Sequence, residues 1–69
     1  MDRPWHYPLS EREAEIAELI AAGSTNAEIA THFGRSQRTI SVRIYYVMMK
    51  LNVGKRADIA AWVAQHRPL

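Results

Sequence analysis

The chain has 69 residues, a formal net charge of +2 and no cysteine. A chain of this length forms one small domain with a limited core, and without thiols it has neither disulfides nor thiolate metal sites. Its three histidines, His6, His32 and His66, lack zinc-ligand spacing. No apolar run reaches the roughly 18 residues that span a bilayer. We therefore expect no cofactor, no metal and, with no signal peptide ahead of the domain, a cytoplasmic protein.

Charge is unevenly distributed along the chain. Residues 1–34 carry six acidic and two basic side chains, a net of −4, whereas residues 35–56 carry six basic side chains and no acidic one. Such segregation predicts one surface that attracts a polyanion and another that repels it. On charge alone, a solvated basic patch without a binding role is the alternative.

Residues 1–8 are predicted to form an extended N-terminal arm, because each of their two prolines biases the preceding residue toward extended geometry. Two interpretations stay open for this segment. In the first, Trp5 and Tyr7 pack an aromatic ring against the domain. In the second, the segment is the stub of a linker from a larger protein. Residues 9–67 are expected to form the helical domain itself.

Two similar signals predict the starts of the first two helices. Ser10 with Glu13, and Thr25 with Glu28, have the spacing of a capping box, in which each side chain bonds the other residue's backbone amide. A glycine follows each of these apolar segments, and glycine readily adopts the left-handed conformation that ends a helix. The sequence therefore predicts two short helices in succession.

A third helix is predicted over residues 37–51, with Ser36 as its N-cap. Its apolar residues fall within about 60° on a helical wheel, as expected of a buried face; they are Ile40, Ile44, Val47 and Leu51. The opposite side carries a mixed set, namely Arg38, Val42, Tyr45 and Met49, with Ser41 at its edge. A flank between the two faces carries Thr39, Arg43 and Lys50.

The connection between the second and third helices is only three residues long and contains Gly34. A turn this short is typical of a helix-turn-helix motif, whose second helix enters the major groove of DNA. A fourth helix is expected from about Arg56 to about His66. Its stripe of Ile59, Trp62 and Val63 is interpreted as core packing or as a dimer seam, and both alternatives stay open.

Read together, LSEREAEI, AAGSTNAEIA and RSQRTISVRIYYVMMKLNV resemble the LuxR-type (GerE-like) helix-turn-helix domain of bacterial transcription regulators. The resemblance covers residues 9–64 without gaps and rests on joint spacing. The matching positions are Leu9, Glu13, Gly23, Asn26, Glu28, Ile29, Ala30, Ser36, Thr39, Ile40, Val47, Lys50, Leu51 and Val53. The resemblance implies an all-α fold of four helices without winged elements.

The resemblance also implies roles for individual residues. Base contacts are implied for Ser41, Val42 and Tyr45, backbone contacts for Thr39 and Lys50, and homodimer formation for the last helix. Three residues depart from the family pattern, which usually has lysine at Ser41, histidine at Arg43 and an apolar residue at Arg35. Without that lysine, readout is expected to use Arg38 or Arg43 and contacts of Val42 and Tyr45 with thymine methyl groups.

The leading prediction is a transcription regulator that binds double-stranded DNA sequence-specifically, as a homodimer, through the recognition helix 37–51. The predicted base-reading residues are Arg38, Ser41, Val42 and Tyr45. The predicted phosphate-binding residues are Arg35, Ser36, Thr39, Arg43, Lys50, Lys55 and Arg56. The predicted dimer interface is Ile59, Trp62 and Val63.

Two other classes of function compare with this prediction as follows. The first is a protein-interaction module that binds another regulator or RNA polymerase through the apolar part of the same helix, since Val42, Tyr45 and Met49 are more apolar than DNA contact requires. The segment TISVRIYYVMMKL also resembles region 4 of sigma factors. An enzyme is not expected, because the sequence lacks a nucleophile with a base at readable spacing and a glycine-rich phosphate loop.

Overall fold

A computed structural model describes residues 3–68, and it contains four helices and no strand within that range. The helices are α1 (Glu11–Ala21), α2 (Asn26–Phe33), α3 (Gln37–Leu51) and α4 (Arg56–His66). The predicted all-α, four-helix class is therefore confirmed. None of these helices is long and apolar enough to cross a membrane.

Local side-chain chemistry explains where α1 and α2 begin. The Ser10 hydroxyl accepts a hydrogen bond from the Glu13 amide at 3.2 Å, and the Glu13 carboxylate accepts one from the Ser10 amide at 2.9 Å. Thr25 and Glu28 form the same reciprocal pair at 3.1 and 2.7 Å. Both predicted capping boxes are present, and each satisfies two amides that have no partner within the helix.

Left-handed residues end α2 and α3. Gly34 has a φ of 64°, and the amide after it, that of Arg35, donates to the carbonyl oxygen of Ala30 at 2.9 Å. At the end of α3 the left-handed residue is Asn52, with a φ of 57°, rather than the nearby Gly54. Asparagine tolerates this conformation better than other residues with a side chain, which explains why no glycine is needed there.

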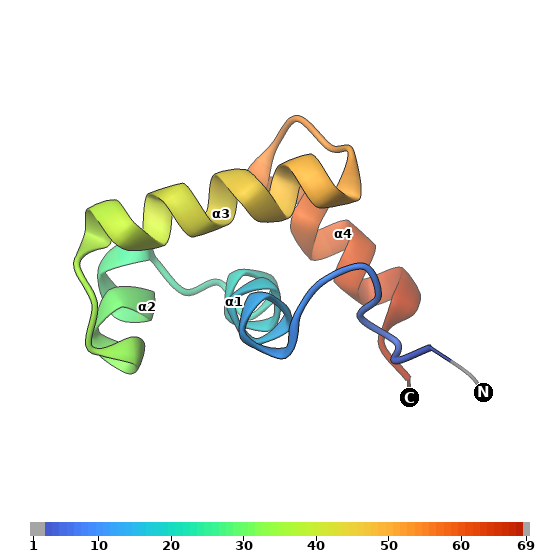
Figure 1. The fold of residues 1–69 in the computed structure, drawn as a ribbon, viewed down its shortest axis with the longest axis horizontal. Helices are drawn as coiled ribbons and strands as arrows, with labels where there is room; N and C mark the ends of the chain where they lie inside the picture. Colours follow the sequence, from blue (N-terminus) through green and yellow to red (C-terminus); the bar gives the residue numbers. More distant parts are fainter. Residues whose placement is uncertain (1–2, 69) are drawn as a thin grey trace.

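Figure 1 shows α3 running across the molecule, with α2 below one end, α1 seen end-on below its middle and α4 descending from the other end. The packed pairs are α1 with α4, α2 with α3, α1 with α3, and α3 with α4. Each helix contributes to one core, whose largest fully buried side chains are Ile16, Ile29, Ile40, Val47 and Ile59. Burial of each such side chain favours folding by roughly 1.5–3 kcal/mol.

The N-terminal segment differs from the extended arm expected for residues 1–8. Within the described part, residues 5–8 form turns, and the Tyr7 amide donates to the Pro4 carbonyl oxygen at 3.0 Å. The turn lays Trp5 against the core beside Trp62, with ring centroids 6.3 Å apart, whereas Tyr7 stays half exposed. Partial burial of the Trp5 ring and the backbone hydrogen bonds of the turn both favour this arrangement. Met1 and Asp2, also assigned to the arm, lie outside the described residues.

Candidate nucleic-acid interface

Helix α3 presents two opposite faces, as its sequence pattern predicted. Ile40, Ile44 and Val47 are at most 5% exposed and belong to the core. On the other side Val42 is 48% exposed and Tyr45 is 56% exposed, and Arg38 is exposed beside them. The core-facing stripe anchors α3 from one end to the other, so the outward side chains project from a fixed support.

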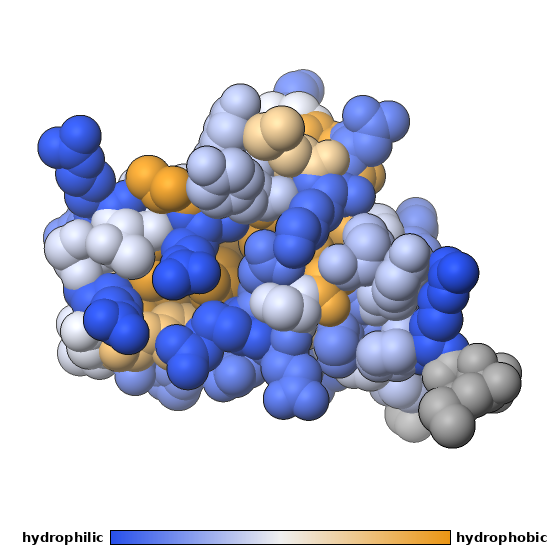
Figure 2. Space-filling view, viewed as in Figure 1, coloured by the Kyte–Doolittle hydropathy of each residue, from blue (hydrophilic) through white to orange (hydrophobic). Residues whose placement is uncertain are grey.

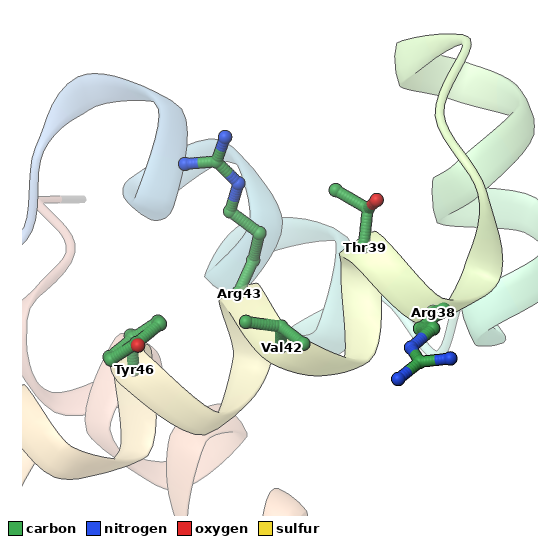
Figure 3. Close-up of a pocket in the computed structure, with 5 residues that line it drawn as sticks. All are labelled: Arg38, Thr39, Val42, Arg43 and Tyr46. Atoms are coloured by element: carbon green, nitrogen blue, oxygen red, sulfur yellow. The ribbon is translucent and has the colours of Figure 1, made fainter.

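The outward face carries a shallow pocket of about 350 Å³, shown in Figure 3. Its lining residues are Arg38, Thr39, Val42, Arg43 and Tyr46. Arg43 and Arg38 extend from opposite edges of α3 in this view, and Val42 lies on the stretch of helix between them. This arrangement offers hydrogen-bond donors and an apolar contact on one surface, which is the combination that the edges of DNA bases accept in the major groove.

Tyr46 was not among the predicted site residues, although it lines this pocket and is 52% exposed. Tyr46 follows Thr39 by seven residues and Arg43 by three, so it lies on the same stripe of the helix. This spacing is the sequence feature that could have identified Tyr46 as a site residue. The phenol adds a neutral hydrogen-bonding group to a flank predicted to be basic.

Besides Lys50, which pairs with Glu13, four of the predicted DNA-binding cations are exposed: Arg35, Arg38, Arg43 and Lys55. Within residues 3–68 no carboxylate forms an ion pair with any of them. Arg35 lies in the turn before α3, and Lys55 is the residue just before α4. The positive charge is therefore spread along and beyond α3.

Helix α1 adds a cation that the charge pattern had assigned to the acidic part of the chain. Arg12 lines a small recess together with Arg35, Thr39 and Arg43. Its guanidinium lies over the Phe33 ring at 5.0 Å and 3.9 Å from the Glu15 carboxylate, an exposed and weak pairing. The packing of α1 on α3 thus extends the basic surface beyond residues 35–56.

Lys50 forms an ion pair within the protein, and its role as a phosphate contact stays a prediction. Its ammonium donates to the Glu13 carboxylate at 2.7 Å, and the side chain of Glu13 is only 12% exposed. Burial raises the pKa of Glu13, but hydrogen bonds from Lys50 and from the Ser10 amide outweigh that effect and hold the pKa below its ordinary value. Lys50 therefore serves to keep a nearly buried carboxylate ionised.

Arg56, also a predicted phosphate contact, forms hydrogen bonds within the protein. Its guanidinium donates to the Ser24 carbonyl oxygen at 2.7 Å and to the side-chain oxygen of Asn26. The amide nitrogen of Asn26 in turn donates to the Ser41 hydroxyl at 3.1 Å. Arg56 therefore joins the start of α4 to the start of α2, and Asn26 joins α2 to α3. No pattern within one helix indicates such a link, because its members are far apart in sequence.

The turn into α3 follows the predicted cap. The Ser36 hydroxyl accepts from the Thr39 amide at 3.1 Å and lies 3.0 Å from the Thr39 hydroxyl. Both hydroxyl groups are therefore engaged in the cap. By helix geometry the amides of Gln37 and Arg38 have no partner inside the helix, and both residues are exposed. The start of α3 thus offers backbone donors next to arginine.

Comparisons with known proteins agree with this geometry. The model of the family described as "Bacterial regulatory proteins, luxR family" matches residues 7–63. The chain belongs to the LuxR family of bacterial regulatory proteins. It is 34% identical over 59 residues to the nitrate/nitrite response regulator protein NarL of Escherichia coli, an alignment that covers 86% of this chain. It is also 38% identical over 53 residues, 77% of the chain, to the transcriptional regulatory protein UhpA of Escherichia coli.

A third relative of this LuxR-family chain is the transcriptional regulatory protein LiaR of Bacillus subtilis, 37% identical over 57 residues and 83% of the chain. The aligned part is 27% of the length of each of these three relatives. The chain therefore spans about a quarter of the length of these relatives. Membership of this family supports DNA binding in transcription regulation as the general role.

The last helix of the LuxR-family domain buries two of the three residues of its apolar stripe. Ile59 is 0% exposed and Val63 is 2% exposed, so both are core residues. Trp62 is partly buried between Trp5 and His66, and the His66 ring stacks on it with centroids 4.1 Å apart. A stripe at helical spacing marks a buried face, but it does not say which partner buries it.

Proposed function

We propose that the chain binds double-stranded DNA sequence-specifically, with α3 in the major groove. The observation that carries the proposal is the outward face of α3, where Arg38, Val42 and Tyr45 are exposed on a helix anchored along its opposite side. Figure 2 shows that hydrophobic side chains on the visible surface lie in small separate areas among hydrophilic ones. Family membership supports the same function.

Different residues perform different parts of this recognition. Base edges are read by Arg38, Ser41, Val42 and Tyr45, with the arginine directed at guanine and the apolar groups at thymine methyl groups. Phosphates are bound by the exposed cations and by the free amides at the start of α3. The cations of this second group are Arg12, Arg35, Arg43 and Lys55. Thr39 and Tyr46 add neutral hydrogen-bonding groups beside them.

Two copies are expected to bind two half-sites about one helical turn of DNA apart. Because Ile59 and Val63 lie inside the core, we expect the two copies to contact each other through the outward side of α4, next to the partly buried Trp62. Sedimentation velocity with and without a two-site DNA tests this part: a 2:1 complex supports it, and a 1:1 complex on that DNA at saturation contradicts it. Because its target is bacterial DNA, the proposed regulator acts in the cytoplasm.

The test of DNA binding is selection from a random-sequence DNA pool, followed by affinity measurements at several salt concentrations. We expect one enriched sequence and an affinity that falls steeply with salt. Arg43→Met should weaken binding to all sequences alike. Arg67→Met is the matched control, because Arg67 pairs with Glu18 at 3.2 Å on another part of the surface, away from α3. A salt-independent affinity, or equal losses for the two variants, would contradict the proposal.

A protein partner is the second candidate. The observation that favours it is a mostly apolar hollow of about 540 Å³ at the C-terminal end of α3, beside Met49, which is 59% exposed. Tyr45, a proposed base-reading residue, lines one side of this hollow, whereas the proposed DNA contact makes no use of Met48, Met49 or Val53. Met49→Asp distinguishes the two candidates: loss of binding to RNA polymerase or another regulator with DNA affinity retained would favour the partner.

A further inference from the structure

A chain of hydrogen bonds connects three helices to the edge of the outward face of α3. It begins at Arg56, which donates to the Ser24 carbonyl oxygen and to the side-chain oxygen of Asn26. It continues from the Asn26 amide nitrogen to the Ser41 hydroxyl at 3.1 Å. Asn26 and Ser41 are 15 residues apart, and Arg56 is 30 residues from Asn26, so only the folded chain brings them together.

The chemistry of the groups determines the direction of every bond in this chain. A guanidinium group has donors only, so the atom of Asn26 that faces Arg56 must be the carbonyl oxygen. The other end of the amide, with its two N–H donors, must then face Ser41. The Ser41 oxygen therefore accepts, and its single hydroxyl proton does not point toward Asn26.

The free proton lies where a base contact is expected. Ser41 is exposed, three residues after Arg38 and four before Tyr45, so it lies within one helical turn of both predicted base-reading residues. With one lone pair taken by Asn26, the hydroxyl keeps its proton and one lone pair for an outward contact. A serine without this partner would offer two lone pairs for each donor, so the Asn26 contact shifts the balance toward donation.

We infer that Asn26 and Arg56 are positioning residues that make Ser41 a hydrogen-bond donor to a base edge. This inference rests on the proposed DNA binding and adds a rule of specificity to it. Acceptors in the major groove are N7 and O6 of guanine, N7 of adenine and O4 of thymine. Ser41 selects such an acceptor at one base pair and disfavours the amino groups of cytosine and adenine.

The main test is Asn26→Asp. A carboxylate still accepts from Arg56, and an acidic residue in the first turn of α2 suits the helix dipole, so the fold is retained. Toward Ser41, however, the carboxylate offers an acceptor and draws the hydroxyl proton inward. The expected result is a loss of about three- to tenfold in preference at one base pair, the scale of one hydrogen bond, with preferences elsewhere unchanged.

Ser41→Ala and the double variant complete a cycle with Asn26→Asp. Ser41→Ala removes the donor and should reduce preference at the same base pair by a similar factor. In the Ser41→Ala background, Asn26→Asp should have no further effect on that preference, although its added negative charge weakens binding to all sequences. Independent effects of the two substitutions on preference would overturn the inference.

Arg56→Met and Lys55→Met form a matched pair that separates positioning from phosphate contact. Loss of one phosphate contact makes the log–log salt dependence shallower by about 0.9. We expect that change for Lys55→Met without a change in base preference. We expect the opposite for Arg56→Met: an unchanged salt dependence and reduced preference at the Ser41 base pair. A shallower salt dependence for Arg56→Met would overturn the inference.

The two proposals fail in different ways. If the unaltered chain shows no sequence preference on DNA, the proposed function fails and the inference fails with it. If the unaltered chain selects a sequence but Ser41→Ala leaves every position of that sequence unchanged, only the inference fails. Ser41 is exposed, so this variant tests the inference even if Asn26→Asp proves unstable.

Discussion

The carboxylate of Glu13 joins the first turn of α1 to the last turn of α3. It accepts from the Ser10 amide within the capping box and from Lys50, which lies 37 residues further along the chain. A carboxylate with so little exposure is costly unless it is paired and hydrogen-bonded. At the residue scale, this pair is thus a structural link that uses one of the predicted DNA-binding cations.

Acid should weaken the fold through Glu13. Because the pKa of Glu13 is lowered in the folded chain, the unfolded chain binds the proton first as the pH falls. The stabilisation from Glu13 is present above its ordinary pKa of about 4.5 and is lost as the pH falls through the lower pKa of the folded state. Urea unfolding from pH 7 down to pH 3 measures this, with Glu13→Gln as control. The variant should lose less stability over that interval, and an equal loss would contradict the assignment.

Removal of Lys50 should also affect the fold. Lys50→Met leaves Glu13 with one fewer partner and should lower the free energy of unfolding by about 1–3 kcal/mol at pH 7. Lys55→Met is the control, because Lys55 is exposed and its change should stay within about 0.5 kcal/mol. Chemical denaturation of both variants is the measurement. Equal stabilities would show that the Lys50–Glu13 pair contributes little.

Base readout is predicted to depend on Val42 and Tyr45. Each alanine substitution, Val42→Ala or Tyr45→Ala, should reduce discrimination at one base pair by roughly 1–3 kcal/mol, because an apolar contact with a base edge is lost. Competition with single-base variants of the selected site measures this. Lys55→Met provides the contrast, since loss of a phosphate contact should weaken all sequences alike. A uniform effect of both alanine substitutions would contradict the base-reading assignment.

At the scale of the element, the turn between α2 and α3 determines how α3 is presented. Gly34→Ala should destabilise the fold by about 1 kcal/mol, because Gly34 has a φ of 64°, where a side chain is strained. The cost is conformational, since nothing lies within 4 Å of a Cβ added there. Gly54→Ala is a matched control, with equal space and no positive φ. Thermal unfolding of the two variants should show the lower midpoint for Gly34→Ala.

At the scale of the whole molecule, packing decides how many cations are free to bind DNA. If the four proposed phosphate-binding cations, Arg12, Arg35, Arg43 and Lys55, each neutralise one phosphate, the log–log salt dependence per protomer should have a slope of about −3.6. If Lys50 and Arg56 contributed as well, the slope would be about −5.4. Titration of a half-site DNA at several salt concentrations distinguishes these values.

The sequence alone determined the helices and the orientation of α3. Caps, left-handed stops and helical periodicity act over three to eleven residues, so Ser10, Thr25 and Ser36 predicted the starts of three helices. The same periodicity predicted that Ile40 and Val47 face the core and that Val42 and Tyr45 face outward. These features are local, and packing of the rest of the chain reinforces them.

Only the tertiary structure decided what each exposed or apolar group does. The sequence offered Lys50 and Arg56 as phosphate contacts and left Ile59 and Val63 as either core residues or a dimer seam. The folded chain pairs the first two internally and buries the others. It also brought Arg12 to the basic surface. The physical reason is that the charge or hydrophobicity of a side chain follows from its residue type. The group that pairs with the charge, or covers the apolar side chain, comes from another helix, and only packing selects it.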